Sequence, residues 1–183
     1  MMCVIYCMRT PRVLKDGACY HINARANRKE MILNSRVMKD LFLSVLVRAR
    51  KKYKFRIENF TVMGNHYHLI MKPAPGQSLS RIMQWIMSVF AMAYNARCGL
   101  TGHVWGQRFF SGIIHSFKDF IRICKYIDGN PVAAQIVVDP REWPFGGLWH
   151  TRTGCLDIIG PAELYVCLSI ESHIQLTLPV YCR

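Results

Sequence analysis

The spacing of hydrophobic and polar residues changes along the chain, and these changes predict where strands and helices lie. Residues 18–25 alternate and predict a strand, whereas residues 35–53 carry apolar side chains at helical spacing. Two further apolar stretches, 55–63 and 66–73, flank the turn dipeptide Gly64-Asn65. They predict a β-hairpin, the best-defined local element of the sequence.

The second half of the pattern predicts two more helices and one more strand. A helix is expected from Ser78 to Arg97, with its end near Gly99. Residues 103–115 suggest a strand with a bulge or turn, and residues 117–129 a helix that stops before the Asn130-Pro131 pair. The resulting order, β-α-β-β-α-β-α, predicts an α+β fold: an antiparallel sheet with helices on one face.

Domain organisation follows from where this pattern fades. We expect one domain over residues 1–150 and an unassigned tail over 151–183, where periodicity is weak. A truncated or frameshifted end would explain the tail, and so would a segment used for dimerisation or hairpin reading. Residues 1–7 are poorly patterned, which makes Met8 a candidate alternative start.

Composition excludes some classes of protein and favours others. The chain has 183 residues, of which 51% are apolar and 19% charged, so it is expected to fold around a core. Lys and Arg number 24 against 11 Asp and Glu, and residues 1–127 hold 21 of these basic residues. The excess favours nucleic acid as the partner, with an anionic membrane surface as second candidate.

The cysteines and the apolar stretches bear on location. No two of the eight cysteines have C-x-x-C spacing, so we expect no structural zinc. The most apolar stretch, 79–93, is interrupted by Arg81 and Gln84 and is too short to span a bilayer. No secretory signal is visible. We therefore expect reduced thiols, a cytoplasmic location and no membrane partner.

His66 and His68 are the first residues that could carry chemistry. Two positions apart on a predicted strand, their side chains leave the same face of the sheet. Two imidazoles placed in this way can bind one divalent metal ion. The alternative is a pair of surface or hydrogen-bonded histidines without a ligand.

Tyr126 and Asn130 are the second pair. Four residues apart at a helix end, they lie on one face of that helix. A phenol, with a pKa of about 10, is a weak nucleophile unless it is activated, and a metal bound to a phosphate oxygen can help by polarising the phosphorus. The Asn130 carboxamide oxygen is a ligand type that suits Mg²⁺ or Mn²⁺. In the alternative, Tyr126 is a core residue and Asn130 ends the helix.

Basic residues gather in residues 25–29 and 48–56, and a third segment, 102–110, combines aromatic residues with arginine. Each of the two basic segments can contact phosphates or form a solvated surface. Residues 102–110 place Arg108 beside aromatic rings, an arrangement that suits base stacking and a packed hairpin equally. The residues that we expect to contact nucleic acid are Arg25, Arg28, Arg48, Arg50, Lys51, Lys52, Lys54 and Arg108.

Four blocks in this order resemble a known family. They are VMGNHYHLIMKP (62–73), SLSRIMQWI (78–86), TGHVWGQRFF (101–110) and YIDGNPVAA (126–134). The sequence resembles the single-tyrosine HUH transposases of insertion sequences, and within them most closely the REP-associated tyrosine transposases. The resemblance covers roughly residues 8–150. Gly64 is a departure, because the pattern leads us to expect proline there.

The resemblance implies a fold, a reaction and a site. The fold would be an antiparallel sheet flanked by helices, similar to ferredoxin-like or RRM-like palm domains. His66, His68 and Asn130 would hold Mg²⁺ or Mn²⁺, and Tyr126 would be the nucleophile. The substrate would be single-stranded DNA beside an imperfect palindromic hairpin. Family members cleave one strand, keep a 5′-phosphotyrosine link and then rejoin the ends, and they often form homodimers.

Two other functions are compatible with the same residues. A non-catalytic, domesticated protein on this fold could bind hairpin DNA or RNA, and its binding would survive loss of metal and of Tyr126. A metal-dependent hydrolase would cleave with water and form no covalent protein intermediate.

Overall fold

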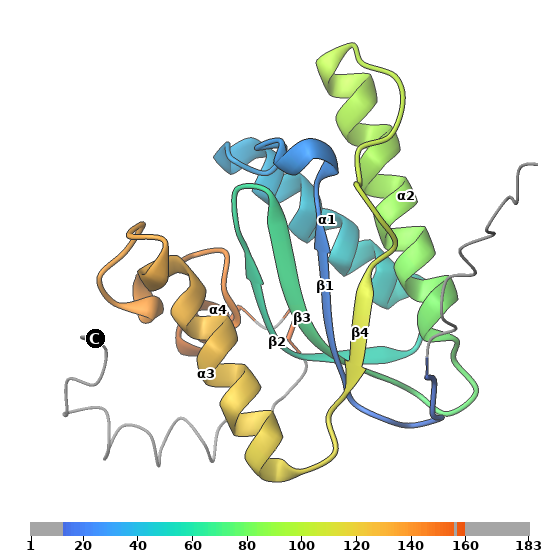
Figure 1. Cartoon of the computed structure of the whole chain (residues 1–183), viewed down its shortest axis with the longest axis vertical. Helices are drawn as coiled ribbons and strands as arrows, with labels where there is room; N and C mark the ends of the chain where they lie inside the picture. The colour runs from blue at the N-terminus through green and yellow to red at the C-terminus, as the bar shows by residue number, and fades with distance from the viewer. Residues whose placement is uncertain (1–12, 156, 160–183) are drawn as a thin grey trace, which may run out of the picture.

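Four antiparallel strands form one sheet in the order β2-β3-β1-β4 (Figure 1). The computed structural model describes residues 13–155 and 157–159. The proposed start at Met8 and most of the predicted tail lie outside these residues. The strands are β1 (Tyr20–Arg25), β2 (Phe55–Val62), β3 (His66–Pro73) and β4 (Phe110–Ile113). The predicted α+β class with an antiparallel sheet is confirmed.

The predicted hairpin is the β2–β3 pair. It runs in register from Val62 opposite Tyr67 to Phe55 opposite Pro73, with an irregularity between Ile57 and Asn59. Gly64 lies in its turn, where the Met31 side chain occupies the space that a Cβ would need. A larger residue at this position would have to displace Met31, which explains glycine at this point of the chain.

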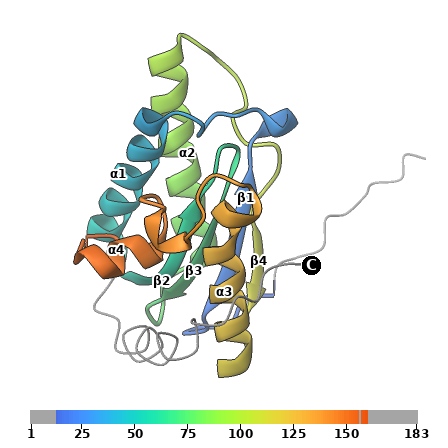
Figure 2. The ribbon, with the colours of Figure 1, turned by 90° about the vertical axis from the view of Figure 1, so that its left-hand side faces the viewer.

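Two helices cover one face of the sheet, as Figure 2 shows. They are α1 (Arg36–Lys52) and α2 (Leu79–Cys98), whose N-terminal N–H groups are capped by Ser35 and Ser78. The core beneath them takes Tyr67, Leu69 and Met71 from β3. These side chains alternate with the residues that point to the other face.

A third helix, α3 (Phe117–Ala133), covers the opposite face (Figure 2). Our expectation of helices on one face is therefore wrong. The physical reason lies in β3, where Ile70 is buried as completely as its neighbours Leu69 and Met71. A strand that is apolar on both faces needs cover on both faces. Ile70 packs with Phe120, Cys124 and Ile127 of α3 in a second, smaller core.

The end of α3 also differs from the prediction. The helix does not stop before Asn130-Pro131 but continues to Ala133, with Pro131 buried inside it. Proline has no N–H for the carbonyl four residues earlier, that of Ile127. The Asn130 side chain compensates: its Nδ2 lies 2.7 Å from the Tyr126 carbonyl oxygen and 3.5 Å from that of Ile127.

The remaining segments frame the sheet. Of the predicted strand 103–115, only Phe110–Ile113 is a regular strand, and in the preceding loop Trp105 forms an isolated bridge with Ala26, the residue after β1. A short helix, α4 (Gly147–Thr153), lies along β2. Single 3₁₀ turns occupy Asn27–Lys29 (η1) and Pro140–Glu142 (η2). No helix within the described ranges is long and apolar enough to cross a membrane.

Candidate active site

Polar side chains line up on the sheet face beneath α3. In the register of the strands, His66 of β3 lies opposite Arg25 of β1, and His68 lies opposite Asn23. Thr61 of β2 flanks His68 on the other side. The period of two along each strand therefore places both histidines on the α3 face, as predicted, while Tyr67 between them points into the main core.

Each histidine ring is held by a hydrogen bond at its Nδ1 atom. Nδ1 of His66 lies 2.8 Å from Oδ1 of Asn65, and Nδ1 of His68 lies 3.1 Å from Nε2 of His21. Because Asn65 Oδ1 can only accept, His66 Nδ1 is the donor and its Nε2 keeps a lone pair. The two rings are perpendicular, with centroids 5.2 Å apart.

The helix α3 adds the other two predicted residues. The Tyr126 ring stands perpendicular to the His68 ring, with centroids 5.4 Å apart, yet the side chain remains 55% exposed. One turn further on, the Asn130 side chain lies beside His66 and raises the pKa of that imidazole. Since Nδ2 of Asn130 donates to the Tyr126 carbonyl, its carboxamide oxygen is the atom that can act as a ligand beside the histidines. The structure thus brings all four predicted residues together.

The environment keeps these imidazoles neutral. Burial, together with the nearby His66, His21 and Arg25, lowers the pKa of His68 to about 3. Burial also lowers the pKa of His66, with Arg25 acting in the same direction and the Asn130 side chain opposing it. Neutral imidazoles present lone pairs to a metal ion at physiological pH.

The residues present fit a divalent metal ion. Two imidazole nitrogens and one carboxamide oxygen form a mixed donor set, and within the described residues no cluster of three His, Cys, Asp or Glu side chains provides another. The oxygen donor suits Mg²⁺ and Mn²⁺, while the imidazoles are more typical of transition metals. His21 and Asn65 orient the two rings, as partners of metal-binding histidines commonly do.

A polar contact that the sequence analysis missed anchors α3 to the sheet. Asn59 of β2 is fully buried, and its Nδ2 donates to Oδ1 of Asp128 at 2.9 Å. Its own Oδ1 accepts the backbone N–H of Phe60 at 2.7 Å. Asp128 lies between Tyr126 and Asn130 in the sequence, so this contact fixes the helix turn that carries both.

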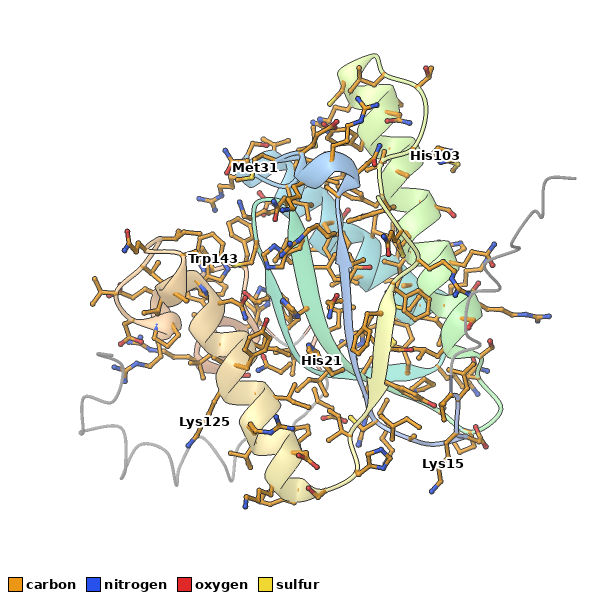
Figure 3. All side chains as sticks on the ribbon, in the orientation of Figure 1. Lys15, His21, Met31, His103, Lys125 and Trp143 are labelled. Carbon is orange, nitrogen blue, oxygen red and sulfur yellow. The ribbon has the colours of Figure 1, made fainter. Side chains whose placement is uncertain are left out.

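His21 is the other residue that the sequence analysis missed. Its ring stacks on His68 with centroids 5.3 Å apart and lies 6.1 Å from the Tyr126 ring. Figure 3 labels it on the sheet, beside α3. The alternation of residues 18–25 could have placed it on the polar face of its strand, but the order of strands that brings it beside His68 is not visible in the sequence.

The predicted nucleic-acid contacts divide between two surfaces. Arg25 stands beside the histidines. Arg28 lies in the 3₁₀ turn η1 that follows β1, and Arg108 lies between Trp105, which pairs with Ala26, and the start of β4. The other group, which we name the α1 basic surface, lies across the last turns of α1 and the start of β2, on the far side of the sheet. Its members are Arg48, Arg50, Lys51, Lys52 and Lys54.

The family is shown by a comparison of the sequence with family models. The model described as "Transposase IS200 like" matches residues 15–130, a range that includes His21, both metal-ligand candidates of β3, Tyr126 and Asn130. The chain belongs to the IS200-like transposase family. No curated protein matches it.

Two solved structures of transposases are similar to this chain. A REP-associated tyrosine transposase bound to a REP hairpin aligns at a TM-score of 0.69 and 22% identity, over 85% of this chain and 93% of that one. A candidate transposase from Deinococcus radiodurans R1 aligns at a TM-score of 0.47 and 16% identity, over 67% and 97% of the two chains. The first of these likenesses establishes the shared fold of this transposase.

Proposed function

We propose that this IS200-like transposase cleaves and rejoins single-stranded DNA beside a palindromic hairpin, with Tyr126 as the nucleophile. The observation that carries the proposal is the meeting of two distant segments: Tyr126 packs against His68, and Asn130 lies beside His66. The hairpin bound by the similar REP-associated transposase supports a hairpin in the substrate. The excess of Lys and Arg supports a phosphate backbone as partner.

The proposed reaction uses the exposed Tyr126 phenol. The Tyr126 oxygen attacks the phosphorus of the scissile phosphate and gives up its proton to solvent, which its exposed side chain allows. A bond forms between this oxygen and phosphorus, the bond from phosphorus to the 3′ oxygen breaks, and that oxygen leaves as a 3′-OH. The 5′ end stays linked to Tyr126. Attack by a 3′-OH reverses the step, so no external energy source is needed.

We infer that His66, His68 and Asn130 hold Mg²⁺ or Mn²⁺ at this site. When bound, the ion neutralises charge on the phosphate and polarises its phosphorus. Arg25 lies beside the same histidines and adds positive charge to the phosphate-binding side. His21, Asn65 and the Asn59–Asp128 contact fix the directions of the ligands before DNA arrives.

A covalent-adduct assay tests the proposal. Labelled single-stranded DNA with a flanking palindrome is mixed with the protein and Mg²⁺ or Mn²⁺, then run on a denaturing gel. We expect a labelled protein band that EDTA abolishes and that Tyr126→Phe and His66→Ala both lack. Tyr94→Phe, which removes a hydroxyl on α2, is the matched control and should keep the band.

Two results would contradict the proposal and identify the alternatives. Cleaved DNA without an adduct, unaffected by Tyr126→Phe, would indicate a hydrolase. Tight hairpin binding that survives EDTA and Tyr126→Phe, with no cleavage by the wild type, would indicate a non-catalytic binder. The proposal also includes a cytoplasmic location and a homodimer. Analytical ultracentrifugation with and without hairpin DNA measures the mass of that homodimer.

A further inference from the structure

Phe110 presents a large apolar ring on the same sheet face as the active site. It lies on the edge strand β4 opposite Asn23, and Asn23 lies opposite His68. Phe110, Asn23 and His68 thus form one row across three strands. Neighbouring strands are about 4.8 Å apart, so Phe110 starts roughly 10 Å from His68. Its side chain is 58% exposed, although apolar rings of this size are usually buried.

The ring of Phe110 is held against the sheet. A Cβ built on Gly112, two residues further along β4, would lie 3.5 Å from both Cε1 and Cζ of the ring, which therefore extends over this glycine. The ring also meets His21 edge to face, with centroids 6.5 Å apart and 73° between the planes. An exposed side chain with two such contacts offers a pre-positioned flat surface.

The sheet around Phe110 has no helical cover on this face. The helix α3 packs mainly against β2 and β3, and Figure 1 shows β4 at the opposite edge of the sheet. In the part of the chain that the structure describes, the β4 edge of this face, where Phe110 is exposed, has no helix over it. Asn23 is half-buried there, and Arg25, in the next row along the sheet and directly opposite His66, is exposed.

We propose that Phe110 is the stacking platform for one nucleobase of the DNA strand that Tyr126 attacks. The Asn23 carboxamide is placed to hydrogen-bond the edge of that base, and Arg25 is placed to contact the adjoining phosphate. The inference rests on the proposed function, because it takes single-stranded DNA as the ligand. The inference adds a DNA-binding subsite beyond the proposed reaction centre of His66, His68, Tyr126 and Asn130.

Chemistry favours a nucleobase at this place over a second protein. Every base has a π-face that stacks on an aromatic ring, and an apolar ring between an amide and a guanidinium matches the base, edge and phosphate of one nucleotide. His21 links the subsite to the reaction centre, because its ring touches both Phe110 and Tyr126.

The test measures binding rather than cleavage. A fluorescent hairpin with a single-stranded extension is titrated with protein in EDTA, and a single abasic site is moved along the extension. In the wild type, we expect the abasic site to weaken binding at one or two positions. Phe110→Ala should weaken binding of the intact DNA about 5- to 140-fold, and the abasic site at those positions should then have no further effect.

Two variants make the outcome specific. Phe110→Trp keeps a stacking surface and should retain most of the affinity. Phe117→Ala removes a ring of nearly equal exposure, 57%, at the start of α3, and should bind like the wild type. The proposal is overturned if Phe110→Ala binds intact DNA normally, or if its abasic penalty persists. A lower solution mass for Phe110→Ala without any loss of DNA affinity would also overturn it, in favour of a protein contact.

Failure of the subsite and failure of the proposed reaction give different results. DNA that binds with no dependence on Phe110, from a protein that still forms the adduct, rejects the subsite alone. DNA that binds through Phe110, from a protein that never forms the adduct, rejects the reaction alone. Absence of any binding to the hairpin DNA rejects both.

Discussion

The Nε2 atom of His21 lies 3.1 Å from the Nδ1 atom of His68, and the two rings stack with 21° between their planes. This contact joins β1 to β3 on the face that α3 covers. When His68 donates through Nδ1, its Nε2 carries the lone pair and remains available for a ligand. His21 therefore orients a proposed metal ligand without being one itself.

Loss of the His21 contact should weaken metal binding. We expect His21→Ala to lower the affinity for Mn²⁺ about 10- to 100-fold, because His68 loses the partner that fixes its ring and tautomer. His21→Gln keeps a side-chain acceptor and should restore part of the affinity. Isothermal titration calorimetry with Mn²⁺, in the presence of DNA that cannot be cleaved, gives the constants. Equal affinity in His21→Ala and the wild type would contradict this role, and His103→Ala serves as a control outside the site.

The contact between Asn59 and Asp128 should stabilise the fold. Asn59 is fully buried and satisfies both the Asp128 carboxylate and the Phe60 N–H. We expect Asn59→Ala to lower the free energy of unfolding by roughly 1–3 kcal/mol, because buried polar groups lose their partner. Asn95→Ala, which removes one side-chain bond to Gly102 in a more exposed loop, should cost less. Urea denaturation of the two variants provides the comparison.

The same contact can be disturbed from its other side. A Cβ on Gly147 would overlap Oδ1 of Asn59, so Gly147→Ala should destabilise the protein as well. Gly129 in α3 has nothing within 4 Å of its Cβ position, and Gly129→Ala should stabilise the helix by about 0.5–1 kcal/mol. If the two alanine variants unfold at the same urea concentration, the packing of Gly147 on Asn59 is not what stabilises this region.

Local periodicity was enough to predict each half of the site. A spacing of two on a strand places His66 and His68 on one face, and a spacing of four on a helix does the same for Tyr126 and Asn130. That the two halves meet depends on α3 packing across β3, a tertiary contact made by Ile70, Cys124 and Ile127. Periodicity contains no information on that contact, and the resemblance to a family supplied it.

Other features depend on contacts that no local pattern encodes. His21 reaches His68 only because β1 pairs with β3, and Asn59 reaches Asp128 beside an irregularity in β2. The end of α3 was predicted wrongly because proline usually ends a helix, whereas here the Asn130 amide binds the carbonyl that Pro131 leaves without a donor. Local patterns in the sequence also do not predict on which side of the sheet the α1 basic surface lies.

Stability should depend on pH through His68. Its pKa falls from 6.5 to about 3 on folding, so the unfolded chain binds a proton below pH 6.5 that the folded protein does not. The free energy of unfolding should therefore be constant above pH 6.5 and decrease by roughly 1 kcal/mol for each pH unit below it. Burial lowers the pKa of His66 and His21 as well, which steepens the decrease.

Guanidinium denaturation between pH 7.5 and 4.5, in EDTA, measures this dependence. The window lies above the ordinary range of Asp carboxyls, so the histidines dominate it. His68→Gln should flatten the slope. A slope in His68→Gln equal to that of the wild type would show that another group takes up the proton.

The two basic surfaces should respond to different parts of the DNA. Arg25 lies at the candidate active site, while Lys51 and Lys54 of the α1 basic surface are exposed on the opposite side of the sheet. A single strand of a few nucleotides that reaches Tyr126 cannot also reach the far side. Arg25→Ala should therefore weaken binding of both a short strand and a hairpin substrate. The double variant Lys51→Gln and Lys54→Gln should weaken only the hairpin substrate.

Salt dependence distinguishes this prediction from a general loss of charge. Each phosphate contact that is removed should reduce the slope of log K against log salt by about 1. We expect the double variant to reduce the slope for the hairpin substrate and to leave the slope for the short strand unchanged. Anisotropy titrations at several salt concentrations give both slopes. If the double variant lowers them equally, the α1 basic surface acts through the overall field of the protein, and the hairpin does not lie on it.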